Sequence, residues 1–168
     1  MLTMALGRNM KFAALMAMGL ALGACAQNPT NGAGAGGAGG VGAASPGSPQ
    51  DFVVNVGDRV FFETDSSELT TQARSTLDKQ ATWLQQYNRY SFTVEGHADE
   101  RGTREYNIAL GARRAQTVRD YLGARGISSA RIRTISYGKE RPVAVCDNIS
   151  CWSQNRRSVT VLSGGAGS

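Results

Sequence analysis

GHADERGTREYNIALGARR, the stretch Gly96–Arg114, joins a predicted strand to a predicted helix. Upstream of this stretch, apolar residues alternate with polar ones at Tyr90, Phe92 and Val94. A period of two residues is typical of a half-buried strand. Gly96 and Gly102 then enclose a short loop that is dense in charge. The stretch therefore predicts a strand, a polar turn and a helix in succession.

The predicted helix carries an arginine inside its apolar stripe. Thr103 is a suitable N-cap for this helix, and Glu105 suits its positive end. At about 100° per residue from Tyr106, Arg114 falls on the apolar face, directly above Asn107 at i, i+7. Arginines are common on exposed helix faces, whereas an arginine in the middle of an apolar stripe indicates a specific role.

A guanidinium in an apolar stripe needs a partner, because its desolvation is costly. Asp99, at the end of the preceding strand, is the candidate partner for Arg114. An acid and a base at this turn, with free N–H groups at the helix start, would hold a zwitterionic ligand. A structural ion pair, or an arginine that reaches out to the helix edge, explains the same pattern. The residues alone leave these alternatives open.

The rest of the chain predicts a β-α-β-α-β-β order. The further elements are a strand at Arg59–Glu63, a helix at about Thr70–Tyr87, the end of the second helix near Arg125, a strand at Arg131–Tyr137 and a last strand with Arg157, Val159 and Val161 on one face. The segment from Tyr137 to Asn155 is predicted to be irregular. Helices that follow strands must cover a sheet, so we expect a two-layer α/β sandwich with a mixed sheet.

The N-terminus has the features of an export signal. In Met1–Ala24, Arg8 and Lys11 precede an apolar run that is too short to span a bilayer. The run ends in LGAC at residues 22–25, which resembles the bacterial lipobox and makes Cys25 the lipidation candidate. A plain signal peptide or a short interfacial anchor is the alternative.

A tether is predicted between Cys25 and the domain. Residues 26–50 are rich in Gly, Ala, Ser and Pro, without charge or periodicity. Such a segment cannot bury enough apolar surface to offset the entropy of ordering, and its root-mean-square span is roughly 25–30 Å. The sequence thus predicts a signal at 1–24, a lipidated linker at 25–50, a domain at 51–163 and a flexible tail at 164–168.

Two cysteines remain in the domain. Cys146 and Cys151 lie four residues apart in a loop, and export would place them in an oxidising compartment. A disulfide between them is the favoured prediction. A metal site is the rival interpretation, but two cysteines without a nearby histidine make a poor zinc site.

The charge of the chain argues against nucleic-acid binding. Removal of the first 24 residues removes two basic residues and no acidic residue, which lowers the formal net charge from +5 to +3. The basic residues are scattered among acidic ones, and no basic stripe with stacking aromatic residues is present. We therefore expect no nucleic-acid partner, although attraction to another anionic polymer remains open.

Catalytic chemistry would have to be built on one histidine. His97 is the only histidine in the chain, and with Asp99 and Glu100 it suggests an alternative function, a metal-dependent periplasmic hydrolase. Side chains alternate along an extended segment, which would separate Glu100 from the other two. Paired carboxylates for glycosidase chemistry are not singled out either. A binding module is the preferred interpretation.

Three strings in the sequence resemble a known family. EGHADERGTREYNIALGARRA, ISYGKERP and NRRSV are similar to the OmpA-like peptidoglycan-binding domains, and the resemblance covers about Asp58–Leu162. It implies a periplasmic, non-catalytic β-α-β-α-β-β domain that binds the stem peptide of the cell wall. In the family, an aspartate of the loop and an arginine of the following helix grip diaminopimelate. The matching residues here are Asp99 and Arg114.

The resemblance also implies further contacts. Asn107 matches a family position near the site, Thr103 lies where helix-start N–H groups would bind a carboxylate, and the turn Thr64–Leu69 supplies contacts in relatives, here Asp65 and Leu69. Many relatives carry Phe-Asp-x-Asp where this chain has Phe-Phe-Glu-Thr-Asp at 61–65, which weakens the prediction for that turn. The roles of Arg156 and Arg157 stay open. We expect Arg114→Leu to leave the domain folded while abolishing wall binding.

With the lipobox and the linker, the resemblance is to lipid-anchored members of this family that work with the Tol system. It implies a tether between outer membrane and cell wall that supports envelope integrity and cell division, with a β-propeller Tol protein and other Tol components as partners. Ala26 follows the lipidated cysteine, where an aspartate would signal retention in the inner membrane. No cofactor is expected apart from the covalent lipid on Cys25.

Overall fold

The computed structural model describes residues 44–163. The predicted signal at 1–24, the lipidation candidate Cys25, most of the linker and the tail at 164–168 lie outside the described residues. The elements, in chain order, are α1 (Pro49–Asp51), a π-helical turn (Phe52–Val56), β1 (Arg59–Phe61), α2 (Thr71–Gln86), β2 (Ser91–His97), α3 (Arg104–Ala124), a 3-10 turn (Ser129–Arg131), β3 (Ile132–Gly138), α4 (Ile149–Asn155) and β4 (Arg157–Ser163).

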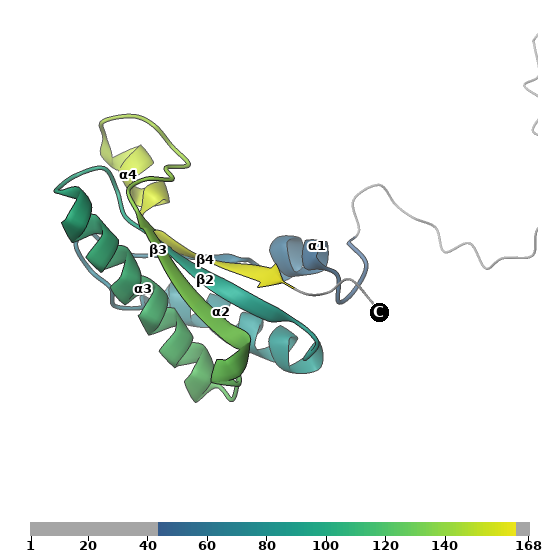
Figure 1. Ribbon diagram of the computed structural model, residues 1–168. Helices are drawn as coiled ribbons and strands as arrows, with labels where there is room; N and C mark the ends of the chain where they lie inside the picture. The colour runs from purple at the N-terminus through teal and green to yellow at the C-terminus, as the bar shows by residue number, and fades with distance from the viewer. Residues whose placement is uncertain (1–43, 164–168) are drawn as a thin grey trace, which may run out of the picture. The chain divides into compact units, whose positions relative to one another are not determined.

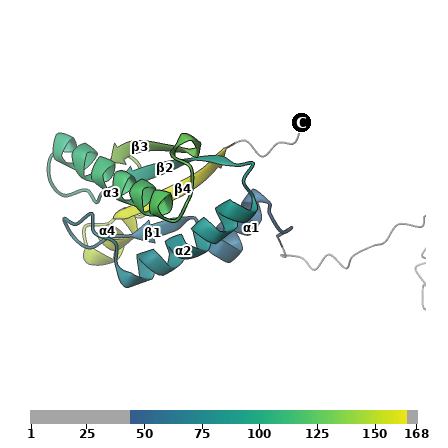
Figure 2. The same cartoon turned by 90° about the horizontal axis from the view of Figure 1, so that it is seen from below.

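The four strands form one mixed sheet in the order β1-β4-β2-β3. β2 and β3 are parallel, whereas β4 is antiparallel to both β1 and β2. α2 and α3 lie side by side on one face of this sheet, as Figures 1 and 2 show from two directions. The predicted two-layer sandwich with a mixed sheet is therefore confirmed. Among the described residues, none of the helices combines the length and the apolarity that crossing a membrane requires.

The two long helices begin where capping residues stand. The side chains of Thr70 and Thr103 accept hydrogen bonds from the N–H groups of Ala73 and Tyr106, which satisfies a free donor in the first turn of each helix. The core lies between these helices and the sheet. Its fully enclosed apolar side chains are Phe52, Leu77, Leu84, Phe92, Val94, Val118 and Leu122.

A close approach between α3 and the sheet positions the start of α3. A Cβ atom on Gly96 would lie 1.8 Å from the carbonyl oxygen of Gly111, so a larger residue would force α3 away from the sheet. The hydroxyl of Ser136 donates to the carbonyl of Ile108 across the same contact. These contacts hold the first turns of α3 against the ends of β2 and β3.

The chain packs against the domain before residue 51, where the sequence analysis placed the domain boundary. The hydroxyl of Tyr90 donates to the carbonyl of Gly47 at 2.8 Å, and the N–H of Gly47 donates to the buried carboxylate of Asp51. The indole of Trp83 donates to the same carboxylate at 2.8 Å. The chain is thus fixed to the folded domain from Gly47 onward, because the N–H and the carbonyl of Gly47 bond to Asp51 and Tyr90.

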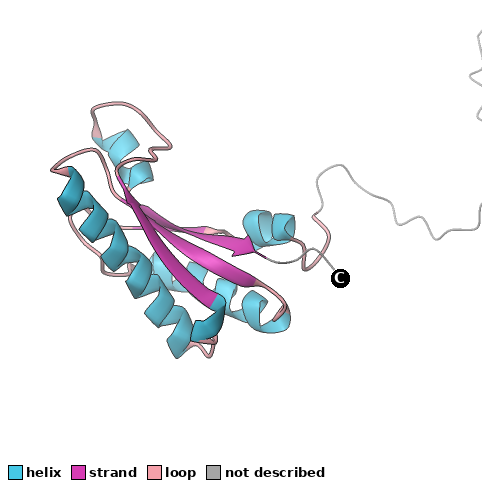
Figure 3. Ribbon diagram, in the orientation of Figure 1, coloured by secondary structure: helices cyan, strands magenta, loops and turns pink. Residues whose placement is uncertain are grey.

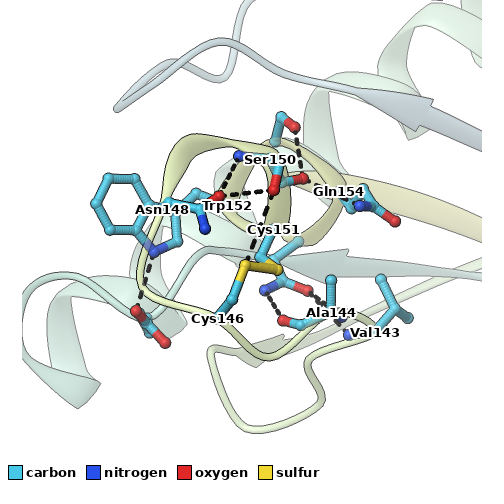
Figure 4. Close-up of a disulfide and its surroundings, with 11 residues drawn as sticks. Val143, Ala144, Cys146, Asn148, Ser150, Cys151, Trp152 and Gln154 are labelled. Carbon is cyan, nitrogen blue, oxygen red and sulfur yellow. Dashed lines mark hydrogen bonds between the residues drawn. A yellow bond between two sulfur atoms is a disulfide. The ribbon is translucent and has the colours of Figure 1, made fainter.

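The segment Tyr137–Asn155 is less irregular than the sequence pattern predicts. It contains α4, a helix of seven residues that Asn148 caps, and the predicted disulfide joins Cys146 in the loop to Cys151 within α4. Figure 3 shows this helix and its loop at the end of the sheet opposite α1, and Figure 4 shows the disulfide in detail. A helix of two turns is too short to produce a clear apolar period, which explains why the pattern missed it.

Candidate functional site

A pocket of about 240 Å³ lies where the end of β2, the start of α3 and the turn after β1 meet. The residues that line it are Thr64, Asp65, Asp99, Arg101, Gly102, Tyr106, Asn107, Leu110 and Arg114. Four of the predicted site residues are therefore brought together: Asp65, Asp99, Asn107 and Arg114. A larger cavity of about 560 Å³ runs along β1 and α2, but it contains none of the predicted site residues.

Arg114 forms the inner wall of the pocket. Its side chain is fully buried, and its Nε, Nη1 and Nη2 atoms donate to the backbone carbonyls of Ser66, His97 and Glu63 at 2.8, 2.8 and 3.1 Å. A guanidinium has five N–H groups, so two of them remain without an acceptor among the described residues. Arg114 ties the turn after β1 to the end of β2.

Arg114 keeps its positive charge at neutral pH. Burial, and then the nearby charge of Arg156, lowers its pKa to about 10, while Asp99 and Asp65 act in the opposite direction. Carbonyl oxygens solvate a guanidinium but do not neutralise it. The inner wall therefore presents a positive charge that an anionic group can compensate.

A direct ion pair between Arg114 and Asp99, one of the alternatives left open by the sequence, is not formed. Asp99 is 7 % exposed, and its ion-pair partners within 4 Å are Arg101, at 2.7 Å, and Arg156, at 3.3 Å. Burial would raise the pKa of Asp99, but hydrogen bonds from Arg101 and Arg156 lower it below its usual value. Arg156, whose role the sequence left open, thus serves the pocket from 57 residues away.

Arg157, the other residue left open by the sequence, has a different role. Its Nη atoms donate to the carbonyls of Asn155 and Arg141, so it braces the backbone around α4. It is buried, but it is not among the residues that line the pocket. The arginine pair at 156–157 therefore divides between the pocket and the backbone: Arg156 is the C-cap of α4, and Arg157 is the first residue of β4.

Tyr106 and Asp65 lie at the rim of the pocket. The Tyr106 hydroxyl hydrogen-bonds to the Asp65 carboxylate, and this bond raises the pKa of Tyr106. Asp65 has a positive φ of 57°, a conformation that aspartate tolerates better than most residues. The sequence placed Tyr106 on the buried stripe of α3, but the structure leaves it 44 % exposed.

Two predicted residues do not line the pocket. The Thr103 hydroxyl is occupied as the cap of α3, where it accepts the N–H of Tyr106 at 3.2 Å. Leu69 belongs to the apolar core. Asn107 does line the pocket, and it donates to the carbonyl of Arg101 at 2.8 Å, which fixes the shape of the turn. Thr103 and Asn107 thus act on the pocket through the backbone.

The three residues of the metal hypothesis are not arranged as a metal site. The His97 ring is 2 % exposed, its carboxylate neighbour within 4 Å is Glu95, and burial, followed by the charges of Arg157 and Arg141, lowers its pKa to about 4. Asp99 is held by two arginines, and Glu100 accepts the indole N–H of Trp152. Within the described residues, no three acidic, histidine or cysteine side chains are grouped as metal ligands.

A mixed sheet backed by two helices, with a charged pocket at the start of the second helix, defines a small binding domain of the OmpA type. The family model described as "OmpA family" matches residues 61–156, more than half of the chain. A solved peptidoglycan-associated lipoprotein from Burkholderia pseudomallei superposes with a TM-score of 0.65 at 35% identity and covers 69% of this chain and 100% of its own.

Curated relatives narrow this class. The chain is 64% identical to the peptidoglycan-associated lipoprotein of Mesorhizobium japonicum, with 95% of both chains covered. It is 63% identical to that of Rhizobium meliloti, with 97% of this chain and 92% of the relative covered. The chain therefore belongs to the peptidoglycan-associated lipoproteins, a group with an OmpA-like domain.

Proposed function

We propose that this chain is a non-catalytic outer-membrane lipoprotein that binds the diaminopimelate of the peptidoglycan stem peptide in the pocket around Arg114. The observation that carries this proposal is the charge arrangement of the pocket. Arg114 lies at its inner wall with two N–H groups unused by the described residues, and the carboxylates of Asp99 and Asp65 line the same cavity. The side chain of diaminopimelate ends in one ammonium and one carboxylate, which match this pair of charges.

In the proposed complex, the ligand carboxylate accepts hydrogen bonds from Arg114 and from N–H groups at the start of α3. The planar guanidinium suits a carboxylate better than an ammonium does. The ligand ammonium faces the two acids of the pocket. Because Arg114 has no solvent-exposed surface, the carboxylate reaches it after the Tyr106–Asp65 contact at the rim opens.

The same geometry supports a proposed preference for cell walls that contain diaminopimelate. A stem peptide with lysine in place of diaminopimelate has the ammonium but lacks the second carboxylate. Its apolar side chain would then face the buried guanidinium of Arg114 without compensating its charge, so binding should be strongly weakened. In this proposal, specificity arises because the guanidinium of Arg114 lacks a partner when the ligand has no second carboxylate.

The proposed cellular role is a tether between outer membrane and cell wall within the Tol–Pal system. Lipid on Cys25 would hold the chain in the membrane, and the Gly/Ala-rich linker would let the domain reach the wall. Each pocket needs only modest affinity, because many anchored copies face a polymeric ligand at high effective concentration. A β-propeller protein and other Tol components are the proposed protein partners, in support of envelope integrity and cell division.

Pelleting with purified sacculi tests the proposal. The full-length chain should pellet with sacculi that contain diaminopimelate and stay in solution with sacculi of the lysine type. No soluble fragments should be released, because the proposed function is binding. Retention on both wall types would contradict the diaminopimelate specificity, and release of fragments would contradict the non-catalytic role.

Asp99→Asn tests the pocket itself, with Asp120→Asn as the matched control. Both variants remove one negative charge, but Asp120 is exposed on α3 and does not line the pocket. Asp99→Asn should reduce the pelleted fraction at least about tenfold, since a charge-assisted contact is lost. Asp120→Asn should pellet like the parent. Equal loss in both variants would show that general charge, rather than the pocket, binds the wall.

A further inference from the structure

We infer that the disulfide-closed loop with α4 positions the ligand-facing turn of the pocket, and that Trp152 is the positioning residue through which the loop acts. This inference rests on the proposed function, because it assigns to α4 the control of that same pocket. Trp152 itself does not line the cavity. It touches the two residues that follow Asp99 in the chain.

Two contacts connect Trp152 with the turn. The indole Nε1 donates to the carboxylate of Glu100 at 2.9 Å, and the guanidinium of Arg101 lies 4.3 Å from the centre of the Trp152 ring. Figure 4 draws the indole of Trp152 with its dashed bond to a carboxylate, on the outer side of the loop that the disulfide closes. The tryptophan therefore engages consecutive residues of the turn with its edge and with its face.

Arg101 connects Trp152 to the pocket, because it contacts both Trp152 and Asp99. Its Nη2 and Nε atoms donate to the two carboxylate oxygens of Asp99 at 2.7 and 3.2 Å, a bidentate arrangement that sets the plane of the carboxylate. The Arg101 side chain is 41 % exposed, so its position depends on a small number of contacts, of which the Trp152 ring is one. Without the Trp152 ring, this long side chain would sample other rotamers, and Asp99 would keep Arg156 and the Arg101 backbone N–H but lose its bidentate contact.

The loop that carries Trp152 is itself held at several points. The disulfide joins Cys146 to Cys151, the residue before Trp152. The Asn155 side chain accepts the N–H groups of Val143 and Ala144 and donates to the carbonyl of Ala144, which closes the loop onto the end of α4. A flexible surface loop could not hold a tryptophan in one place, whereas this loop can.

Lys139, at the start of the same loop, supports the turn from its backbone side. Its ammonium donates to the carbonyls of Glu100 and Gly102 at 3.1 and 2.7 Å. The segment between β3 and β4 thus contacts the turn at both of its ends, through Lys139 and through Trp152. This arrangement is what a positioning device requires, and a loop that only linked two strands would need neither contact.

The test measures binding of a stem tripeptide that ends in meso-diaminopimelate to the full-length lipoprotein by titration calorimetry. Trp152→Ala should weaken binding about tenfold, because a cation–π contact and a hydrogen bond to a charged group are lost. Trp152→Phe keeps the ring and loses the N–H donor, so it should weaken binding about threefold. Ile149→Ala, an exposed residue of the same helix, should bind like the parent.

A double-mutant cycle with Arg101→Ala separates positioning from general destabilisation. In the Arg101→Ala background, Trp152→Ala should weaken binding less than about twofold further, because the tryptophan acts through that arginine. Equal binding by Trp152→Ala and the parent, or a full additional loss in the Arg101→Ala background, would overturn the inference. If Trp152→Ala does not fold, the same cycle is measured with Trp152→Leu, which also removes the aromatic ring from Arg101. Failure of the parent to bind the tripeptide would instead refute the proposed function.

Discussion

The inner wall of the pocket and the turn after β2, which carries Asp99 and Arg101, are built in different ways. At the inner wall, one buried side chain, Arg114, donates to three backbone carbonyls from two segments. In the turn after β2, the carboxylate of Asp99 is held by Arg101, which stacks on Trp152. All three side chains retain some exposure. The inner wall thus joins ligand binding to the stability of the domain. The turn after β2 couples ligand binding to the position of the loop with α4, so changes there should reduce stability less.

The largest effect should come from the inner wall. Arg114→Leu should lower the free energy of unfolding by about 3–5 kcal/mol, because it leaves one buried and two partly buried carbonyls without their donors. This replaces the expectation from sequence that the variant stays fully folded. Urea unfolding measures the change. Arg113→Leu, its exposed neighbour on α3, is the control and should change stability by less than about 0.5 kcal/mol. A small effect at both positions would show that the inner wall has no structural role.

Acid should weaken the same region through His97. The folded-state pKa of this buried imidazole is about 4, below its usual 6.5, so the unfolded chain binds the proton first. Stability should be insensitive to this group above pH 6.5 and should fall as the pH decreases towards 4, by about 3 kcal/mol in total. His97→Leu should remove this part of the slope, which unfolding curves between pH 7 and 4 measure. Because the chain has one histidine, an unchanged slope would contradict the assignment.

Opening the loop that supports the turn after β2 should have a smaller effect on stability. Replacing both Cys146 and Cys151 with serine opens a short loop, which should lower stability by at most about 2 kcal/mol. Affinity for the diaminopimelate tripeptide should fall several-fold, while the acid response assigned to His97 should stay as in the parent. Treatment of the parent with a reductant should reproduce the double serine variant, and the variant itself should not respond. A loss of stability without any loss of affinity would show that the disulfide does not influence ligand binding in the pocket.

The fold was largely predictable because its signals are local. The alternation in β2 and the caps Thr70 and Thr103 lie within a few residues of the elements that they specify. The spacing of Cys146 and Cys151 likewise predicted the disulfide that the structure contains. The exceptions include α1, the π-helical turn and α4, which are too short for a periodic pattern.

The candidate site was predictable in its members more than in its contacts. The helical wheel identified Arg114 as buried, which the structure confirms. Its acceptors were missed because they are backbone carbonyls, which every residue carries and no sequence pattern marks. Arg156 and Trp152 were missed as well, since the first is 57 residues from Asp99 and the second is 52 residues from Glu100.

The sequence by itself determined the order of strands and helices, the turn that carries Asp99 and the burial of a positive charge on α3. These features depend on interactions between near neighbours in the chain, and periodicity and capping report such interactions directly. Only the tertiary structure decided which groups Arg114 and Asp99 contact, and that a loop between β3 and β4 supports the turn. Those contacts arise when α3 closes onto the sheet and brings distant segments together, so the sequence shows the participants but not their pairing.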